Sequence, residues 1–321
     1  MELEVSGKKY VKNKKIALGQ SCCLEKQDYI LFKLGMYSGV GKIINRDKCY
    51  VKVKDITMSG FKLLTAPKQS ELIRFNEEIV EKAAEEARSF IRHIYNKYIS
   101  PGFIHVSFSG GADSTAVLTL AVEELGQEKV IAVTSDTGLE FPENKKYIES
   151  LTEKLGVRLV VLKPTRDFLS EISSRGLMRV DNRWCTEFMK LKPLRDYYSS
   201  KNVKMYLDGA RDYESHQRAR SPRLSENPSI PGVYRALPIK RWPRMLVQLY
   251  LLSRSIDMNP LYDLGFTRIG CVVCPAMHRH ELVLSYLKYQ DIHQRILDLT
   301  GVSLDTYLSM KWTGRRIFSR D

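Results

Sequence analysis

The residues from Phe103 to Thr115 constrain this chain more than any other stretch, because they describe a strand that runs through a glycine turn into a helix. Residues 103–108 are mostly apolar and include β-branched side chains, which is typical of a buried strand. Gly110 and Gly111 follow, and glycine permits backbone angles and a close approach that other residues do not. Residues 112–126 have helical periodicity. Free N–H groups and the dipole at the start of such a helix favour an anion, so the stretch predicts a phosphate-binding loop.

Two common phosphate-binding motifs do not occur in the chain. It contains neither the Walker pattern Gly-x-x-x-x-Gly-Lys-Ser/Thr nor the dinucleotide fingerprint Gly-x-Gly-x-x-Gly. The pattern that remains, Ser-Gly-Gly-x-Asp-Ser after a strand, resembles the PP-loop of the ATP pyrophosphatase superfamily. The resemblance implies a loop that binds the phosphates of a nucleotide whose α-phosphate is attacked while pyrophosphate leaves. It implies nucleotide contacts by Ser109, Gly110, Gly111, Asp113, Ser114 and Thr115.

A second motif, Asp136-Thr137-Gly138, ends the predicted strand at 130–134 and is followed by Phe141-Pro142-Glu143. The two features together resemble the phosphoadenosine phosphosulfate (PAPS) reductase branch of the superfamily. This resemblance implies nucleotide contacts by all three residues of the motif, with Asp136 also near the magnesium ion of the nucleotide. Helix capping is the alternative role for Asp136, because Pro142 suits the first position of a helix.

A third segment, from Gly209 to Ser215, follows the predicted strand at 204–208 and matches the pattern Gly-x-Arg-x-x-Glu-Ser of the same branch. Guanidinium groups near a pyrophosphate make bidentate, permanently charged contacts that stabilise a leaving group. The resemblance implies further nucleotide contacts by Gly209, Arg211, Ser215 and Arg218. The catalytic residues expected from the three motifs are Asp113, Asp136 and Arg211.

The six cysteines favour thiols or metal ligands over disulfides in a cytoplasmic chain. Cys271-Val272-Val273-Cys274 has the spacing at which two thiolates hold one metal. In iron–sulfur members of the PAPS reductase branch, a Cys-Cys pair joins a later Cys-x-x-Cys to hold a four-iron cluster. Here Trp184 stands at the first position of that pair and Cys185 at the second. The resemblance therefore implies an iron–sulfur cluster held by three cysteines, which are Cys185, Cys271 and Cys274.

Two alternatives remain for the three cysteines: a zinc site completed by His278 or His280, and unligated core thiols. A cluster with three protein thiolates resembles the RNA-thiolating PP-loop enzymes more than the redox reductases. The reductases also carry a catalytic cysteine near the C-terminus, whereas no cysteine follows Cys274. Cys22 and Cys23 are candidates for a redox pair or a sulfur carrier.

Alternating strands and helices from residue 103 onward predict an α/β fold with a doubly wound parallel sheet. The adenine nucleotide alpha hydrolase-like fold is the one that the resemblance implies. Short alternating segments near the N-terminus predict a small β-rich domain with a faint resemblance to PUA-type RNA-binding modules. The predicted organisation is a small β-rich domain at 1–66, a linking amphipathic helix at 67–100, a catalytic domain at 101–300 and a basic C-terminal tail at 301–321.

The chain has a formal net charge of +14, from 51 basic and 37 acidic residues. This imbalance favours a nucleic-acid partner, although a basic or charge-rich surface of a thermophilic protein is an alternative. No apolar run reaches the roughly eighteen residues of a membrane span, so we expect no membrane association and a cytoplasmic location. A homo-oligomer is compatible with the sequence.

The first hypothesis for the function is an ATP-dependent PP-loop enzyme that adenylates a substrate oxygen, releases pyrophosphate and inserts sulfur, with tRNA as the substrate. It implies ATP, magnesium, the three-cysteine cluster and a sulfur donor. A PAPS or adenosine phosphosulfate reductase is the second hypothesis, with the sulfonucleotide in place of ATP. An FAD synthetase-like nucleotidyltransferase is the third, and an RNA-binding module on a decayed catalytic fold is the non-enzymatic alternative.

Overall fold

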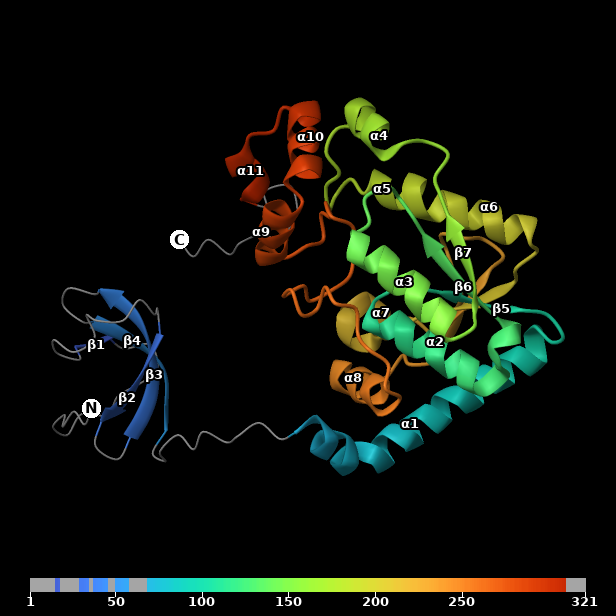
Figure 1. Ribbon diagram of the computed structural model, residues 1–321, viewed down its shortest axis with the longest axis horizontal. Helices are drawn as coiled ribbons and strands as arrows, with labels where there is room; N and C mark the ends of the chain where they lie inside the picture. Colours follow the sequence, from blue (N-terminus) through green and yellow to red (C-terminus); the bar gives the residue numbers. More distant parts are fainter. Residues whose placement is uncertain (1–14, 18–28, 35–36, 46–49, 58–67, 310–321) are drawn as a thin grey trace. The chain divides into compact units, whose positions relative to one another are not determined.

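The computed structural model of the protein describes residues 15–17, 29–34, 37–45, 50–57 and 68–309 (Figure 1). Cys22, Cys23 and Cys49, and most of the predicted basic tail, lie outside the described residues. The chain divides into two compact units, Met1–Lys68 and Gln69–Asp321.

The first unit contains an antiparallel sheet in the order β1-β4-β3-β2. Its buried side includes Phe32, Val51 and Val53. Gly41 is required there, because a Cβ at this position would lie 1.9 Å from Cγ1 of Val51. The predicted small β-rich N-terminal unit is therefore confirmed, while its likeness to PUA-type modules stays a prediction. The strands are β1 (Lys15–Ala17), β2 (Tyr29–Leu34), β3 (Tyr37–Asn45) and β4 (Tyr50–Thr57).

The second unit is built on a six-stranded sheet in the order β7-β6-β5-β8-β10-β9. All neighbours pair in parallel except β9, which is antiparallel to β10. The chain runs outward from β5 through β6 to β7 and then returns to place β8 on the other side of β5. The gap between β5 and β8 is therefore the topological switch point, where such sheets bind ligands. The strands are β5 (Ile104–Ser107), β6 (Val130–Ser135), β7 (Arg158–Leu162), β8 (Met205–Leu207), β9 (Leu224–Glu226) and β10 (Tyr234–Ala236).

Helices cover both faces of this sheet, because alternate strand residues point to opposite sides. Val130 and Ala132 of β6 pack on one side with α1 (Gln69–Tyr98), α2 (Ala112–Leu125), α3 (Pro142–Lys154) and α8 (Arg244–Ser253). Ile131 and Val133 pack on the other side with Tyr198 of α6 (Lys192–Ser200). The doubly wound α/β fold is thereby confirmed.

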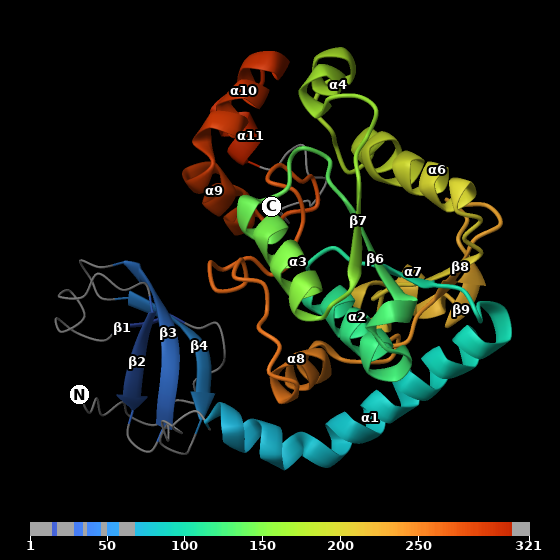
Figure 2. The same ribbon diagram turned by 45° about the vertical axis from the view of Figure 1, so that its right-hand side comes forward.

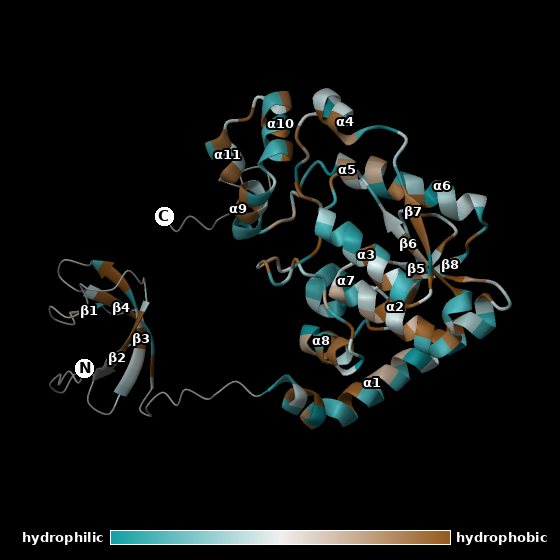
Figure 3. Cartoon of the chain, viewed as in Figure 1, coloured by the Kyte–Doolittle hydropathy of each residue, from teal (hydrophilic) through white to brown (hydrophobic). Residues whose placement is uncertain are grey.

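Helix α1 is amphipathic, as predicted, and alternates hydrophobic and hydrophilic residues along its length (Figure 3). Its buried residues include Ala84, Ala87, Ile91 and Ile94, spaced three or four apart. They pack against α2 and α8, so this helix is part of the core of the second unit.

A further hydrophobic cluster joins the short helices after β7, the non-helical segment 261–277 and the helices at the C-terminal end of the described chain. Helices α4 and α10 lie side by side in both views (Figures 1 and 2). No helix among the described residues is long and apolar enough to cross a membrane. The remaining helices are α4 (Phe168–Arg175), α5 (Trp184–Thr186), α7 (His216–Arg220), α9 (Arg279–Lys288), α10 (Gln290–Thr300) and α11 (Leu304–Leu308).

Candidate nucleotide-binding site

The phosphate loop, residues 109–115, leaves β5 and enters α2 under tight constraint from its surroundings. Gly110 has a φ of +74°, and a Cβ there would lie 2.1 Å from Oδ1 of Asn144. Asn144 of α3 donates through Nδ2 to the carbonyl of Ser109 at 3.2 Å. Buried Asn259 donates to the carbonyl of Gly110 at 3.1 Å and to Asn144 at 2.7 Å. Two asparagines that the sequence motifs did not identify thus fix the shape of the loop.

The first turn of α2 is arranged as an anion site. Gly111 is its N-cap and has no side chain to cap the helix N–H groups. Ser114 Oγ accepts from the N–H of Ser109 at 3.2 Å and donates to the carbonyl of Gly111 at 2.9 Å, which closes the loop. The N–H of Ala112 donates to the Tyr262 hydroxyl at 3.0 Å. A tyrosine oxygen therefore takes one of the donors that a phosphate oxygen would use.

The segment after β8 approaches the phosphate loop at the switch point of the sheet. A Cβ at Gly209 would lie 2.8 Å from the carbonyl carbon of Asp113 and 2.9 Å from the nitrogen of Ser114. Buried Arg211 pairs with Asp113, its Nε at 2.7 Å from Oδ1 and its Nη2 donating to Oδ2 at 3.1 Å. Nη1 of Arg211 donates to the carbonyl of Trp242 at 3.1 Å. The structure therefore brings together four residues that the sequence predicted for one site, which are Asp113, Ser114, Gly209 and Arg211.

Two carboxyl groups of this region are shifted toward their neutral forms. Burial raises the pKa of Asp113, and the charge and hydrogen bonds of Arg211 only partly oppose this rise. Burial likewise raises the pKa of Asp208 against the opposing charge of Arg235. Desolvated carboxylates of this kind favour a nearby cation, either a guanidinium group or a metal ion.

A cavity of about 870 Å³ opens over the phosphate loop and the segment after β8. Its volume falls in the range of small-molecule and cofactor sites. Three of the lining residues are not among the site residues predicted from the sequence, and they are Arg244, Tyr262 and Arg268. They lie after the recognised motifs and belong to no motif of their own. The ionisable and hydroxyl side chains of the lining are Ser107, Ser109, Asp113, Ser114, Asp208, Arg211, Tyr213, Glu214, Ser215, Arg218, Arg244, Tyr262, Thr267, Arg268 and His278.

The Gly-x-Arg-x-x-Glu-Ser segment is held by its own side chains. The Glu214 carboxylate accepts from the N–H of Arg211 at 2.7 Å and pairs with the guanidinium of Arg218. Ser215 Oγ caps α7 by accepting from the N–H of Arg218 at 3.2 Å. Ser215 and Arg218 both line the cavity. Their predicted nucleotide contacts stay predictions.

The Asp136-Thr137-Gly138 motif lies beyond the lining of this cavity. Asp136 accepts from Lys145 Nζ at 2.9 Å and from the N–H of Gly138 at 3.0 Å. Burial alone would raise the pKa of Asp136, but the hydrogen bond of Lys145 and the N–H of Gly138 hold it below its usual value. Lys145 adjoins Asn144, so one helix contacts both the phosphate loop and this motif. Roles for Asp136 in catalysis and magnesium binding stay predictions.

Thr137 connects the motif to the cysteines. Its N–H donates to Glu140 at 2.7 Å and its hydroxyl at 3.0 Å, and burial raises the pKa of Glu140. The Thr137 hydroxyl lies 3.7 Å from the sulfur of Cys271. Cys271 also pairs with Glu140 in an isolated β-bridge. The motif that follows strand β6, the neighbour of β5, therefore contacts the thiol of Cys271.

The cysteine cluster, defined as Cys185, Cys271 and Cys274, lies in or against the hydrophobic cluster of the short helices. Burial raises the pKa of Cys271 to about 11, although the charge of Lys190 opposes this rise. Burial and the neighbouring Cys274 raise the pKa of Cys185. The sequence-predicted trio thus occupies one region, and the expected fourth position is taken by Trp184, whose indole donates to the carbonyl of Gly176 at 3.2 Å.

The cysteine cluster is not assembled as a metal site in this arrangement. Within the described part of the chain, no group of three or more histidine, cysteine, aspartate or glutamate side chains is arranged to hold a metal ion. His278 lines the cavity over the phosphate loop and stacks on His280, with ring centroids 5.7 Å apart. The zinc alternative therefore has no assembled site among these residues either. Cluster and zinc both stay predictions.

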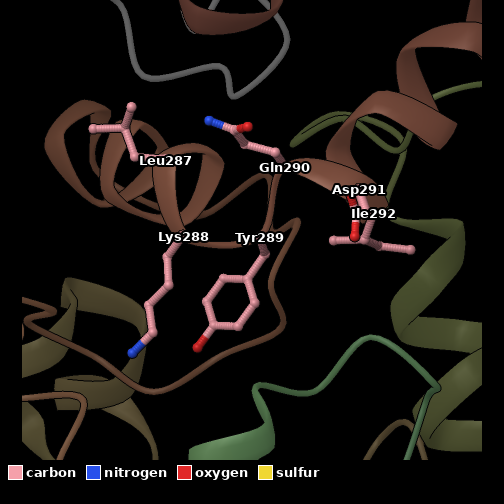
Figure 4. A pocket seen from close by; sticks show the side chains of 6 residues that line it. All are labelled: Leu287, Lys288, Tyr289, Gln290, Asp291 and Ile292. Atoms are coloured by element: carbon pink, nitrogen blue, oxygen red, sulfur yellow. The ribbon is translucent and has the colours of Figure 1, made fainter.

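A second cavity, of about 420 Å³, is lined by the consecutive residues 287–292 between α9 and α10 (Figure 4). Lys288 and Tyr289 point the same way in this view, and both contact Glu143 of α3. Burial and Glu143 raise the pKa of Tyr289. Lys288 and Tyr289 are thus already engaged by Glu143, and none of the sequence-predicted site residues lines this cavity, so we do not regard it as the functional site.

A parallel sheet with an uncapped helix N-terminus and a buried arginine at its switch point defines a nucleotide-binding α/β protein. Residues 104–277 match the family model described as the phosphoadenosine phosphosulfate reductase domain, and the chain belongs to this family. The resemblance stated from the PP-loop and Asp-Thr-Gly motifs is thereby confirmed.

Three relatives illustrate this membership. An uncharacterized protein of Methanocaldococcus jannaschii is 36% identical over 213 residues, which are 66% of this chain and 44% of that protein. A second uncharacterized protein of the same organism is 30% identical over 298 residues, which are 92% of this chain and 71% of the relative. A phosphoadenosine 5'-phosphosulfate reductase of Vibrio vulnificus is 26% identical over 221 residues, covering 67% of this chain and 82% of the reductase. The first match thus spans less than half of that relative.

Proposed function

We propose that this chain is an ATP-dependent sulfurtransferase that replaces a carbonyl oxygen of RNA, and of tRNA in particular, with sulfur. One observation carries the proposal: the sulfur of Cys271 lies 3.7 Å from the hydroxyl of Thr137, in the motif that ends the strand next to the phosphate loop. A reaction that first activates its substrate with a nucleotide and then transfers sulfur would use both the phosphate loop and the nearby Cys271 thiol.

The groups around the cavity have roles in this proposal that follow from their charge. The first turn of α2 binds the β- and γ-phosphates, and Arg211 neutralises charge that develops as pyrophosphate leaves. Asp113 and Asp136 help to position a magnesium ion, which polarises the phosphate oxygens when bound. Arg218, Arg244 and Arg268 raise the local concentration of a polyanionic substrate.

The reaction has two displacements. In the first, the substrate oxygen forms a bond to the α-phosphorus, the α–β phosphoanhydride bond breaks, and pyrophosphate leaves. In the second, hydrosulfide attacks the activated carbon, and AMP leaves with the original oxygen. The hydrosulfide arrives as sulfide and keeps its oxidation state, so this displacement needs no oxidant or reductant. The cysteine cluster is the described group suited to bind it beside the activated nucleotide.

An anaerobic assay with ATP, magnesium, sulfide and unfractionated tRNA tests the proposal. We expect pyrophosphate release together with a thionucleoside that is detected by mass spectrometry of the digested RNA. The Cys271→Ser variant separates the two steps, since it should release pyrophosphate without forming the thionucleoside. Absence of any thionucleoside with the wild-type chain would overturn the proposal.

Sulfonucleotide reduction is the second candidate, and the family match favours it. The three arginines beyond the phosphate loop suit the additional sulfate and phosphate groups of such a substrate. Sulfite release from PAPS or adenosine phosphosulfate in the presence of a dithiol reductant distinguishes this reaction from thiolation. Nucleotidyl transfer of the FAD synthetase kind assigns no role to the cysteine cluster and is the weaker candidate.

A further inference from the structure

A single cross-strand row of the N-terminal sheet carries one tyrosine and three lysines. Tyr29 of β2 is opposite Lys42 of β3, Lys42 is opposite Lys52 of β4, and Lys52 is opposite Lys15 of β1. The row therefore crosses all four strands, with about 4.8 Å between neighbours. We call Lys15, Lys42 and Lys52 the lysine row.

The lysine row faces away from the core of the sheet. Its neighbours Gly41, Ile43, Val51 and Val53 are buried, so the lysines between them point to the opposite face. Tyr29 is 52% exposed. Four more large aromatic or apolar side chains of the described strands are also exposed, and they are Leu31 at 65%, Ile44 at 42%, Tyr37 at 40% and Tyr50 at 39%. Lys42 Nζ lies 6.0 Å from the centre of the Tyr29 ring. Positive charge and flat apolar surface thus occur together.

Within the described strands, no acidic side chain pairs with the lysine row. The strands β1 to β4 contain a single acidic residue, Asp55, and its carboxylate accepts from the N–H of Ile56 at 3.0 Å. Among the residues that the structure describes, the lysine row takes part in no ion pair. Like charges directly opposite one another on neighbouring strands destabilise a sheet. An external anion would remove that repulsion.

Protection of the sheet edges does not account for the row. Lysines that prevent edge-to-edge aggregation belong on edge strands. Here the edges are β1 and β2, whereas Lys42 and Lys52 lie on the two central strands. A partner that contacts the middle of the exposed face explains this position.

We propose that the exposed face of the N-terminal sheet binds single-stranded RNA, with the lysine row on the phosphodiester backbone and Tyr29 under a base. Single-stranded nucleic acids bind to surfaces that combine positive charge with aromatic stacking platforms. RNA is favoured over a membrane or an acidic protein surface because the exposed Tyr29 ring lies in the same row as the lysines and matches a base that stacks beside its phosphate. This inference rests on the proposed function, because it assigns the surface that would bind the RNA substrate. RNA binding is measured without ATP or sulfur, so the binding inference and the proposed thiolation can fail independently.

Fluorescence anisotropy of the full-length chain with a fluorescein-labelled twelve-nucleotide RNA tests this inference. The Lys42→Gln/Lys52→Gln variant should bind more than about fivefold more weakly at 0.15 M salt and should lower the salt slope by about 1.4, the value for two lost phosphate contacts on a single strand. Tyr29→Ala should weaken binding at least about fivefold, the lower range for loss of one stacked base.

The matched control is Lys97→Gln/Lys201→Gln, which removes the same charge from exposed positions of the second unit. This control should keep wild-type affinity and salt slope. Folding of the test variant is checked by its thermal midpoint, which should equal or exceed that of the wild type because repulsion has been removed. The inference would be overturned if the control variant weakened binding as much as the test variant. It would also be overturned if duplex RNA bound more tightly than single-stranded RNA, or if polyglutamate competed as well as unlabelled single-stranded RNA.

Discussion

The guanidinium of Arg211 lies 2.7 Å from the carboxylate of Asp113. The pair joins the loop after β5 to the segment after β8, and so spans the switch point of the sheet. Arg211 is buried, whereas the Asp113 side chain is 29% exposed toward the cavity. A ligand that enters therefore meets a carboxylate whose charge is already balanced and a guanidinium whose position is already fixed.

We expect Arg211→Ala to lower the free energy of unfolding by about 2 kcal/mol at pH 7, because Asp113 loses the partner of its buried charge. Burial already raises the pKa of Asp113 above 3.8, and loss of Arg211 raises it further. Between the unfolded-state pKa of Asp113 and the higher pKa that Asp113 has in the folded variant, the folded state binds more protons than the unfolded state. The free energy of unfolding of the variant therefore falls as pH rises through this range. The difference in free energy of unfolding between the wild type and Arg211→Ala, which we call the deficit, should therefore shrink as pH is lowered from 7 toward 4.

Denaturant titrations at several pH values measure this dependence. The double variant Asp113→Asn/Arg211→Ala is the control, because it lacks the titrating carboxyl and should show no narrowing of the deficit at low pH. A deficit of Arg211→Ala that is constant from pH 7 to pH 4 would contradict the assignment of the effect to Asp113.

Gly209→Ala should destabilise the second unit by about 2 kcal/mol and abolish detectable nucleotide binding by calorimetry. The added Cβ would lie within 3 Å of backbone atoms of Asp113 and Ser114, and backbone cannot move aside as a flexible side chain can. Gly111→Ala is the matched control for stability, since its Cβ would meet nothing closer than 3.5 Å and its φ is −81°. Equal thermal midpoints for the two variants would contradict the prediction.

Much of the fold was predictable, because each strand and helix carries its own periodicity. The strand expected within residues 103–108 is β5 (Ile104–Ser107), and the helical periodicity of residues 112–126 corresponds to α2 (Ala112–Leu125). Helix α6 continues from helical turns that begin at Trp184, and a π-helical turn at Glu187–Leu191 interrupts the usual spacing between them. Local patterns gave the elements, and irregular turns limited their boundaries.

The candidate site was predictable only where a motif carries it. Gly110 and Arg211 belong to motifs, and the structure places the first in the phosphate loop and the second against Asp113 of that loop. Asn259 and Tyr262 contact the same loop from about 150 residues along the chain, in a segment without regular structure. No local spacing encodes such contacts, because they arise only when the chain folds back on itself. Their discovery required the three-dimensional arrangement.

We expect Tyr262→Phe to bind inorganic pyrophosphate about two- to tenfold more tightly than the wild type. The hydroxyl accepts the N–H of Ala112 at 3.0 Å, so a phosphate oxygen has to displace a hydrogen bond worth about 0.5–1.5 kcal/mol. Calorimetric titration gives the two affinities. The matched control is Tyr95→Phe, whose hydroxyl donates to the carbonyl of Gly102 away from the loop and should leave the affinity unchanged. Weaker binding by Tyr262→Phe would instead make this hydroxyl a ligand-binding group.

The predicted iron–sulfur cluster is tested by measuring the iron and the acid-labile sulfide bound to the chain. The three thiols lie in one region but are not arranged as ligands among the described residues, so a metal has to draw them together. After anaerobic reconstitution we expect bound iron and acid-labile sulfide, and loss of both in each of Cys185→Ala, Cys271→Ala and Cys274→Ala, because three thiolates are the minimum set. Cys22→Ser/Cys23→Ser is the matched control and should retain the metal. Zinc without sulfide would select the alternative site, and binding that survives all three single variants would contradict both.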